Sequence, residues 1–64
     1  MIHIELLRES DKGKSVTYSP FEFSIPDKGV ITNWDEKFIY IKFENTVKPF
    51  PVNPEDLEYE NYKI

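Results

Sequence analysis

The sequence predicts a small all-β domain of about five short antiparallel strands, with a one-turn 3-10 helix near the C-terminus. Three observations support this fold class. Aromatic residues make up 16% of the 64 residues and lie among β-branched neighbours. The chain contains no alanine or glutamine, so good helix formers are scarce. Its five prolines are spaced so that they would interrupt any long helix. A chain of this length forms one domain, predicted over residues 1–64 with residues 60–64 frayed.

The first strand is predicted over residues 2–8, because Ile2, Ile4 and Leu6 alternate with other residues and would share one face. Residues 10–13 carry a turn signal in which Gly13 can take a positive φ angle. A second short strand follows over residues 15–18. The N-terminal third is therefore expected to form a pair of strands joined by a turn.

The segment 21–25 alternates apolar and polar residues, but Pro20 and Pro26 bracket it. Proline cannot donate to a sheet ladder, so this segment is predicted to be an edge strand or an ordered loop. Residues 26–29 read Pro-Asp-Lys-Gly, which predicts a tight turn with Gly29 in a left-handed conformation. A strand is then predicted over residues 30–34.

The clearest strand signal lies at residues 38–43, after a tight connection at residues 35–37. Its alternation places Ile39, Ile41 and Phe43 on one face, which is predicted to be the core face. Phe38, Tyr40 and Lys42 lie on the other face, which Lys42 makes the wetter one.

The remaining elements close the sheet. Residues 44–45 predict a hairpin turn, with the asparagine tolerating positive φ. Residues 47–52 would pair back as an edge strand, because two prolines two positions apart are tolerated only there. Residues 53–57 show an asparagine cap, a proline and two acids, which predict one turn of 3-10 helix. A last short strand is predicted over residues 57–59.

Composition argues against enzymatic chemistry. The chain has no cysteine and one histidine, His3, so thiol chemistry is excluded and no metal site or cofactor is expected. The adjacent carboxylates Glu55 and Asp56 would point about 100° apart on a helical turn, and stabilisation of the turn explains them. With Gly13 and Gly29 as the only glycines, no glycine-rich phosphate loop exists. We therefore expect no enzyme.

Charge sets the expected partners. Twelve acidic and eight basic residues give a net charge of −4, with a single arginine. A negative field repels phosphate backbones, so nucleic acid is disfavoured as a partner. No apolar run is long enough to span a membrane, and the N-terminus lacks the features of a signal peptide. The expected location is the cytoplasm.

The stretch 29–43, GVITNWDEKFIYIKF, followed by NPEDLE at 53–58, resembles a group of small bacteriophage and prophage proteins. In that group a Gly-x-Val/Ile-Thr-Ser/Asn strand leads to an alternating aromatic–aliphatic strand, and the chain closes with a Pro-Glu-Asp-Leu turn. The resemblance covers about half of the chain, residues 29–59. It implies a small SH3-like barrel and a phage or prophage context, and it brings no catalytic residues.

Four aromatic residues are the candidate contact residues: Phe38, Tyr40, Phe50 and Trp34. Phe38 and Tyr40 lie opposite the core face, where they either form a binding surface or are covered by the loop at 19–28, whose apolar residues need a place to pack. Phe50 stands between two prolines that stiffen the backbone, so it either displays its ring to a partner or plugs one end of the barrel. Trp34 is either a core residue or part of the contact surface.

The favoured function is a non-enzymatic module, a phage or prophage accessory protein that contacts another protein through surface aromatics. Two alternatives stay open. One is a nucleic-acid-binding SH3-like domain, or an acidic mimic of nucleic acid that acts on a host factor. The other is a structural role as a homodimer through an edge strand, so the expected state is a monomer or a weak homodimer.

Overall fold

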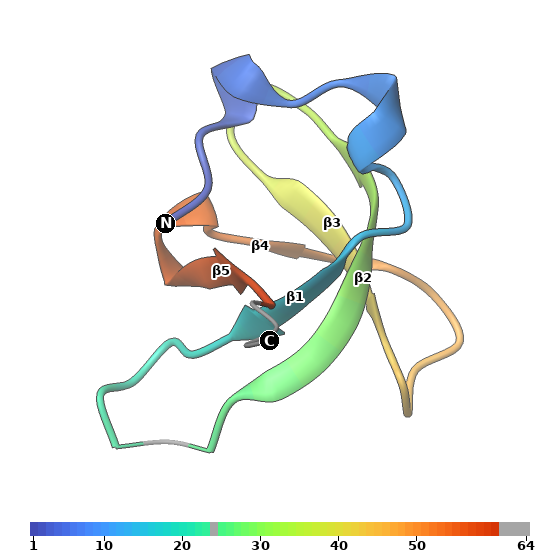
Figure 1. The fold of residues 1–64 in the computed structure, drawn as a ribbon. Coiled ribbons are helices and arrows are strands. Elements are labelled where there is room, and N and C mark those ends of the chain that lie inside the picture. The colour runs from blue at the N-terminus through green and yellow to red at the C-terminus, as the bar shows by residue number, and fades with distance from the viewer. Residues whose placement is uncertain (24, 61–64) are drawn as a thin grey trace, which may run out of the picture.

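A computed structural model describes residues 1–23 and 25–60, and over them the chain is all-β. The predicted class, short antiparallel strands with a 3-10 turn near the C-terminus, is confirmed (Figure 1). The strands are β1 Ser15–Tyr18, β2 Asp27–Trp34, β3 Ile39–Phe43, β4 Phe50–Val52 and β5 Leu57–Tyr59. The 3-10 turns are η1 Ile4–Leu6, η2 Glu9–Asp11 and η3 Pro54–Asp56.

The five strands pair in the order β4-β3-β2-β1-β5, with every neighbouring pair antiparallel. Strand β2 pairs with β1 over residues 27–30 and with β3 over residues 29–34, so this long strand carries the sheet around the core (Figure 1). A bulge at Thr32 increases the bend, and the Thr32 hydroxyl donates to the Tyr40 carbonyl at 3.0 Å. Strands β4 and β5 are the edges of this open sheet, and η3 connects them.

The core consists of seven buried apolar side chains, contributed by every strand and by the N-terminal segment: Ile2, Val16, Ile31, Ile39, Ile41, Val52 and Leu57. The predicted faces of β3 are confirmed, since Ile39 and Ile41 are both 0% exposed while Lys42 is exposed. Phe43 packs against the core from its margin and contacts the Tyr18 ring, with centroids 5.9 Å apart.

The predicted first strand over residues 2–8 is wrong. The segment forms the 3-10 turn η1, in which the Leu6 amide donates to the His3 carbonyl. No edge is available for it beside β1, because β2 occupies one side of that strand and β5 the other. The Ile2 amide instead donates to the Pro54 carbonyl, which seats Ile2 in the core. In this turn Leu6 no longer lies on the same face as the buried Ile2, and its side chain is 70% exposed.

The predicted turn at residues 26–29 is also wrong, since β2 begins at Asp27. Gly29 lies inside the strand without a positive φ, and its role is close approach: a Cβ atom there would stand 2.5 Å from Ile41 Cγ2. Within the described residues Gly13 alone has a positive φ, 91°, as predicted. Asn45 therefore does not take the left-handed conformation expected for the turn between β3 and β4.

The C-terminal elements follow the prediction. Strand β4 is an edge strand, and η3 begins at an asparagine cap in which Asn53 Oδ1 accepts the Glu55 amide at 3.0 Å. The expected fraying does not extend to Glu60, whose amide donates to the Ser15 carbonyl at 3.1 Å. Residues 61–64, the rest of that prediction, lie outside the described residues.

Asp11 is the buried charged residue of the described chain. One carboxylate oxygen accepts the Arg8 amide at 2.9 Å, and the other accepts the Lys14 ammonium at 2.7 Å. The bond from Lys14, followed by that from the Arg8 amide, lowers the pKa of the Asp11 carboxyl below its usual range. Asp11 thus fixes the turn that leads from η2 into β1.

Acid should therefore weaken the fold through Asp11. Because the pKa is depressed in the folded chain, the stabilising effect is complete above the unfolded pKa of about 3.9 and is lost as the pH falls through the folded value. Urea unfolding at several pH values should show Asp11→Asn less stable than wild type at pH 7, with the gap closing in acid. A gap that stays constant down to pH 2 would contradict the assigned role.

Candidate binding surface

Phe38 and Tyr40 line a shallow recess of about 460 Å³ at the turn between β2 and β3, together with Asp35, Glu36 and Lys37. Phe38 is 41% exposed and Tyr40 is half-buried, so the loop at 19–28 does not bury Phe38. The covered cluster considered from the sequence is thus absent at this position, and the Phe38 ring is open to solvent.

Asp35 organises this recess. Its Oδ1 accepts the Phe38 amide at 2.7 Å and the Lys37 amide at 2.8 Å, and its Oδ2 accepts the Tyr40 hydroxyl at 3.0 Å. The hydrogen bonds from the Phe38 and Lys37 amides lower the pKa of the Asp35 carboxyl. The hydrogen bond that the Tyr40 hydroxyl donates to Asp35, together with the negative charge of Asp35, raises the pKa of the Tyr40 phenol. Both carboxylate oxygens are engaged by the turn itself, which makes Asp35 a structural residue of the connection.

Trp34 and Phe50 lie apart from that recess. Trp34 stands opposite Ile39 in the β2–β3 ladder and packs against the core, with the Lys12 ammonium 5.7 Å from its ring centroid. Phe50 stands opposite Ile41 on the edge strand β4 and is 50% exposed, so it does not plug the core. The four candidate residues therefore do not form one surface.

The most exposed apolar side chains lie in two loops. Phe21, Phe23 and Ile25 of the β1–β2 loop, and Val47 of the β3–β4 loop, are between 73% and 94% exposed. Antiparallel pairing places these loops at the same end of the sheet, away from η1 and η2 (Figure 1). Phe50 begins β4 directly after the second loop. We call these five residues the apolar rim.

The sequence held a signal for the rim that its interpretation missed. The segment 21–25 was predicted to be an edge strand or an ordered loop, and its described residues form a loop, because Pro20 and Pro26 keep them out of the ladder, where β1 ends at Tyr18 and β2 begins at Asp27. Apolar residues in a proline-bracketed loop have no sheet face to join, so they extend into solvent. The same reasoning applies to Val47, which precedes Pro49 and lies before the start of β4.

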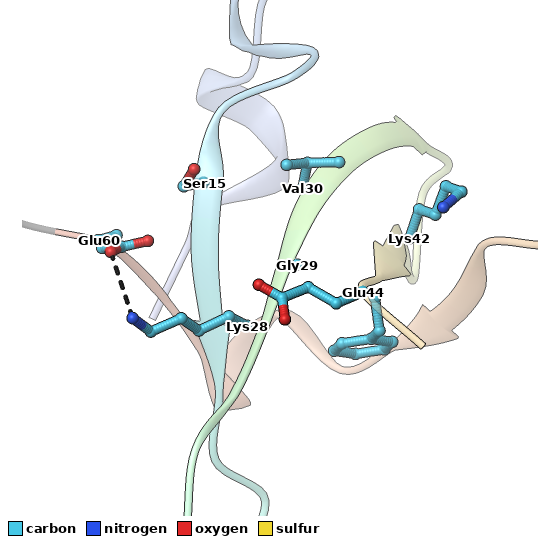
Figure 2. Close-up of a pocket in the computed structure, with 8 residues that line it drawn as sticks. Ser15, Lys28, Gly29, Val30, Lys42, Glu44 and Glu60 are labelled. Carbon is cyan, nitrogen blue, oxygen red and sulfur yellow. Dashed lines mark ion pairs between the residues drawn. The ribbon is translucent and has the colours of Figure 1, made fainter. Parts of the chain in front are cut away.

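A second recess lies on the outer face of the sheet, where β1, β2 and β3 meet (Figure 2). It measures about 370 Å³ and is lined by both signs of charge. Lys28 Nζ lies 3.8 Å from Glu60 Oε2, and Lys42 and Glu44 stand across the recess from them (Figure 2). Opposite charges compensate one another here, so the recess favours neither an anion nor a cation.

Over residues 1–23 and 25–60 no group of three or more histidine or acidic side chains is placed to hold a metal ion. No helix in this part of the chain is long and apolar enough to cross a membrane. No family model, curated protein or solved structure matches the chain. The exposed apolar side chains at the loop end of the sheet are therefore the feature from which a function can be argued.

Proposed function

We propose that the protein is a non-enzymatic binding module that contacts another protein through the apolar rim. The observation that carries this proposal is the exposure of five large apolar side chains at one end of a small sheet. The sequence resemblance adds the proposed context, a cytoplasmic phage or prophage accessory protein.

Energetics favour this assignment. Single exposed apolar residues are common on any protein, whereas Phe21, Phe23 and Ile25 lie within five residues of one loop. Apolar side chains grouped in this way usually mark an interaction surface. A fully exposed aromatic side chain can bury about 150–250 Å² on contact. Phe23 at 94% exposure retains nearly all of that area, Phe21 at 73% about three quarters and Phe50 at 50% about half, which suits the centre of a standard interface of about 800 Å² per partner. A small ligand would leave most of this area in water, so the rim fits a macromolecular partner.

The rim stands on paired strands, and hydrogen bonds hold the second of its two loops. Both loops start from paired strands, and the Tyr18–Phe43 ring contact lies where β1 and β3 enter them. Thr46 holds the second loop, since its Oγ1 accepts the Phe43 amide and its amide donates to the Phe43 carbonyl. A loop fixed in this way loses less conformational entropy on binding than a free one.

Replacing both Phe23 and Ile25 with serine should abolish partner binding and leave the fold intact. Both side chains are highly exposed, so the free energy of unfolding should change by less than about 0.5 kcal/mol. The measurement is capture of proteins from a bacterial lysate on immobilised wild-type and variant chains, with proteins retained by wild type alone counted as partners.

Two matched variants sharpen this test. Leu6→Ser removes an exposed apolar side chain at the opposite end of the molecule, and Phe38→Ser removes one from the β2–β3 recess. Both should retain the captured protein. Capture that survives in the Phe23/Ile25 variant, or that is lost equally in the Leu6 variant, would contradict the rim as the binding surface. Loss in the Phe38 variant alone would move the surface to the recess.

A further inference from the structure

We infer that the partner of the apolar rim is a basic protein segment, in which apolar side chains are flanked by lysine or arginine. The inference rests on the proposed function and adds the chemistry of the partner. Its starting point is the charge at the rim: Glu22 stands between two rim phenylalanines, and Asp27 opens β2 directly after the first loop. Both acids are exposed.

Fewer free lysine charges than carboxylate charges lie around the apolar rim. Lys28 lies with its Nζ 3.8 Å from Glu60 Oε2, so its charge is largely offset on the outer face of the sheet (Figure 2). Lys48 is the other base among residues 19–23, 25–28 and 44–50. The rim is therefore an apolar surface bordered by an excess of carboxylates, on a chain whose net charge is −4.

A partner surface is expected to complement this pattern. Phe21, Phe23 and Ile25 would be covered by apolar side chains, and lysine or arginine around them would face Glu22 and Asp27. Complementary charges at the border of an interface speed association and exclude partners with the wrong charge. The long stems of lysine and arginine also pack on aromatic rings, which the rim supplies.

The same charges disfavour two other occupants. In a symmetric pair of chains joined rim to rim, the acidic border of each copy would meet that of the other, and like charges across an interface are destabilising. At a membrane, insertion of Phe21 and Phe23 would draw the carboxylate of Glu22 toward the hydrocarbon, and the anionic cytoplasmic leaflet would repel it. A basic protein segment carries neither cost.

The test uses two labelled probe peptides with the same central Leu and Ile residues, one flanked by lysines and the other by glutamates. At low salt the lysine peptide should bind at least about tenfold more tightly, a difference of about 1.4 kcal/mol, and salt should reduce the difference. Amide shifts in NMR spectra should map to residues 21–27 and 44–50. The double variant Glu22→Lys/Asp27→Lys should abolish or reverse the preference.

Equal affinity for the two peptides, or no binding of the lysine peptide, would overturn the inference. Phosphatidylcholine vesicles that bind wild type and release the Phe23→Ser variant would assign the rim to lipid. A dimer in sedimentation that this variant dissociates would assign it to a second copy. If lysate capture needs Phe23 but the peptides are not distinguished, the protein-binding function stands and the basic partner is wrong. If capture survives without Phe23, the function fails too.

Discussion

Replacing Ile41 with alanine is expected to destabilise the fold by about 2–5 kcal/mol, as for other large-to-small changes in a core. Ile41 is fully buried in the middle of β3, where it stands between Ile31 of β2 and Phe50 of β4. The loss is comparable to the whole stability of a domain this small, about 3–5 kcal/mol. Circular dichroism during urea titration should show the variant largely unfolded without denaturant.

A milder change keeps that experiment informative. Ile41→Val removes one methyl group and should cost about 0.5–1.5 kcal/mol, which leaves a folded population to measure. Leu6→Ala is the control, because Leu6 is 70% exposed and its truncation should cost less than about 0.5 kcal/mol. If the alanine variants at positions 41 and 6 lost equal stability, the inward facing of β3 would be wrong.

The second large effect is expected at Gly29. An added Cβ atom would stand 2.5 Å from Ile41 Cγ2 and 2.9 Å from the Lys42 carbonyl oxygen, both far inside normal contact distance. The carbonyl belongs to the β2–β3 ladder, so relief requires the two strands to separate at this point. Gly29→Ala should therefore cost about 1–3 kcal/mol, the range found for overpacked cores, although alanine normally favours folding over glycine.

A double-mutant cycle identifies the cause of that loss. Ile41→Leu keeps the side-chain volume, so it should leave a folded population, but it lacks the branch methyl group that the new Cβ would meet. Gly29→Ala combined with Ile41→Leu should therefore cost less than the two single changes together. Gly13→Ala separates conformation from crowding, because a Cβ at Gly13 meets nothing within 4 Å and only its positive φ is strained. Additive costs at positions 29 and 41 would show that close packing is not why glycine occupies position 29.

Short sequence patterns correctly predicted the elements that depend only on residues close together in the chain. The alternation at 38–43 identified β3 and its buried isoleucines, and the run from Asn53 to Leu57 identified η3 with its cap. Two closely spaced prolines identified β4 as an edge strand. In each case a short-range rule, such as a capped turn or a missing donor, is enough to decide the structure.

The N-terminal segment and Gly29 could not be predicted in this way. Whether residues 2–8 form a strand depends on whether β1 has a free side, and β5, more than 50 residues from Met1, occupies it. The residues before Gly29 look like a turn, but position 29 needs glycine because it lies so close to Ile41 on another strand. Both features depend on contacts between segments far apart in the sequence.

The candidate surface was only partly predictable for the same reason. The sequence left open whether Phe38, Tyr40 and Phe50 are exposed or covered, and in the structure Phe38 and Phe50 are exposed while Tyr40 is half-buried. Their separation onto different parts of the molecule follows from strand pairing and not from composition. The apolar loop at 21–25 looked like a lid for a second cluster, yet the loop is short and leads directly from β1 into its paired neighbour β2.

Amide hydrogen exchange followed by NMR tests the central claim, a sheet built on β3 that leaves the apolar rim in solvent. The ladder amides of Ile31, Ile39 and Ile41 should exchange only through global unfolding, whereas those of Phe23 and Ile25 should exchange at nearly the rate of an unfolded chain. Rapid exchange at Ile39 and Ile41, or strong protection at Phe23 and Ile25, would contradict both the packing and the proposed binding surface.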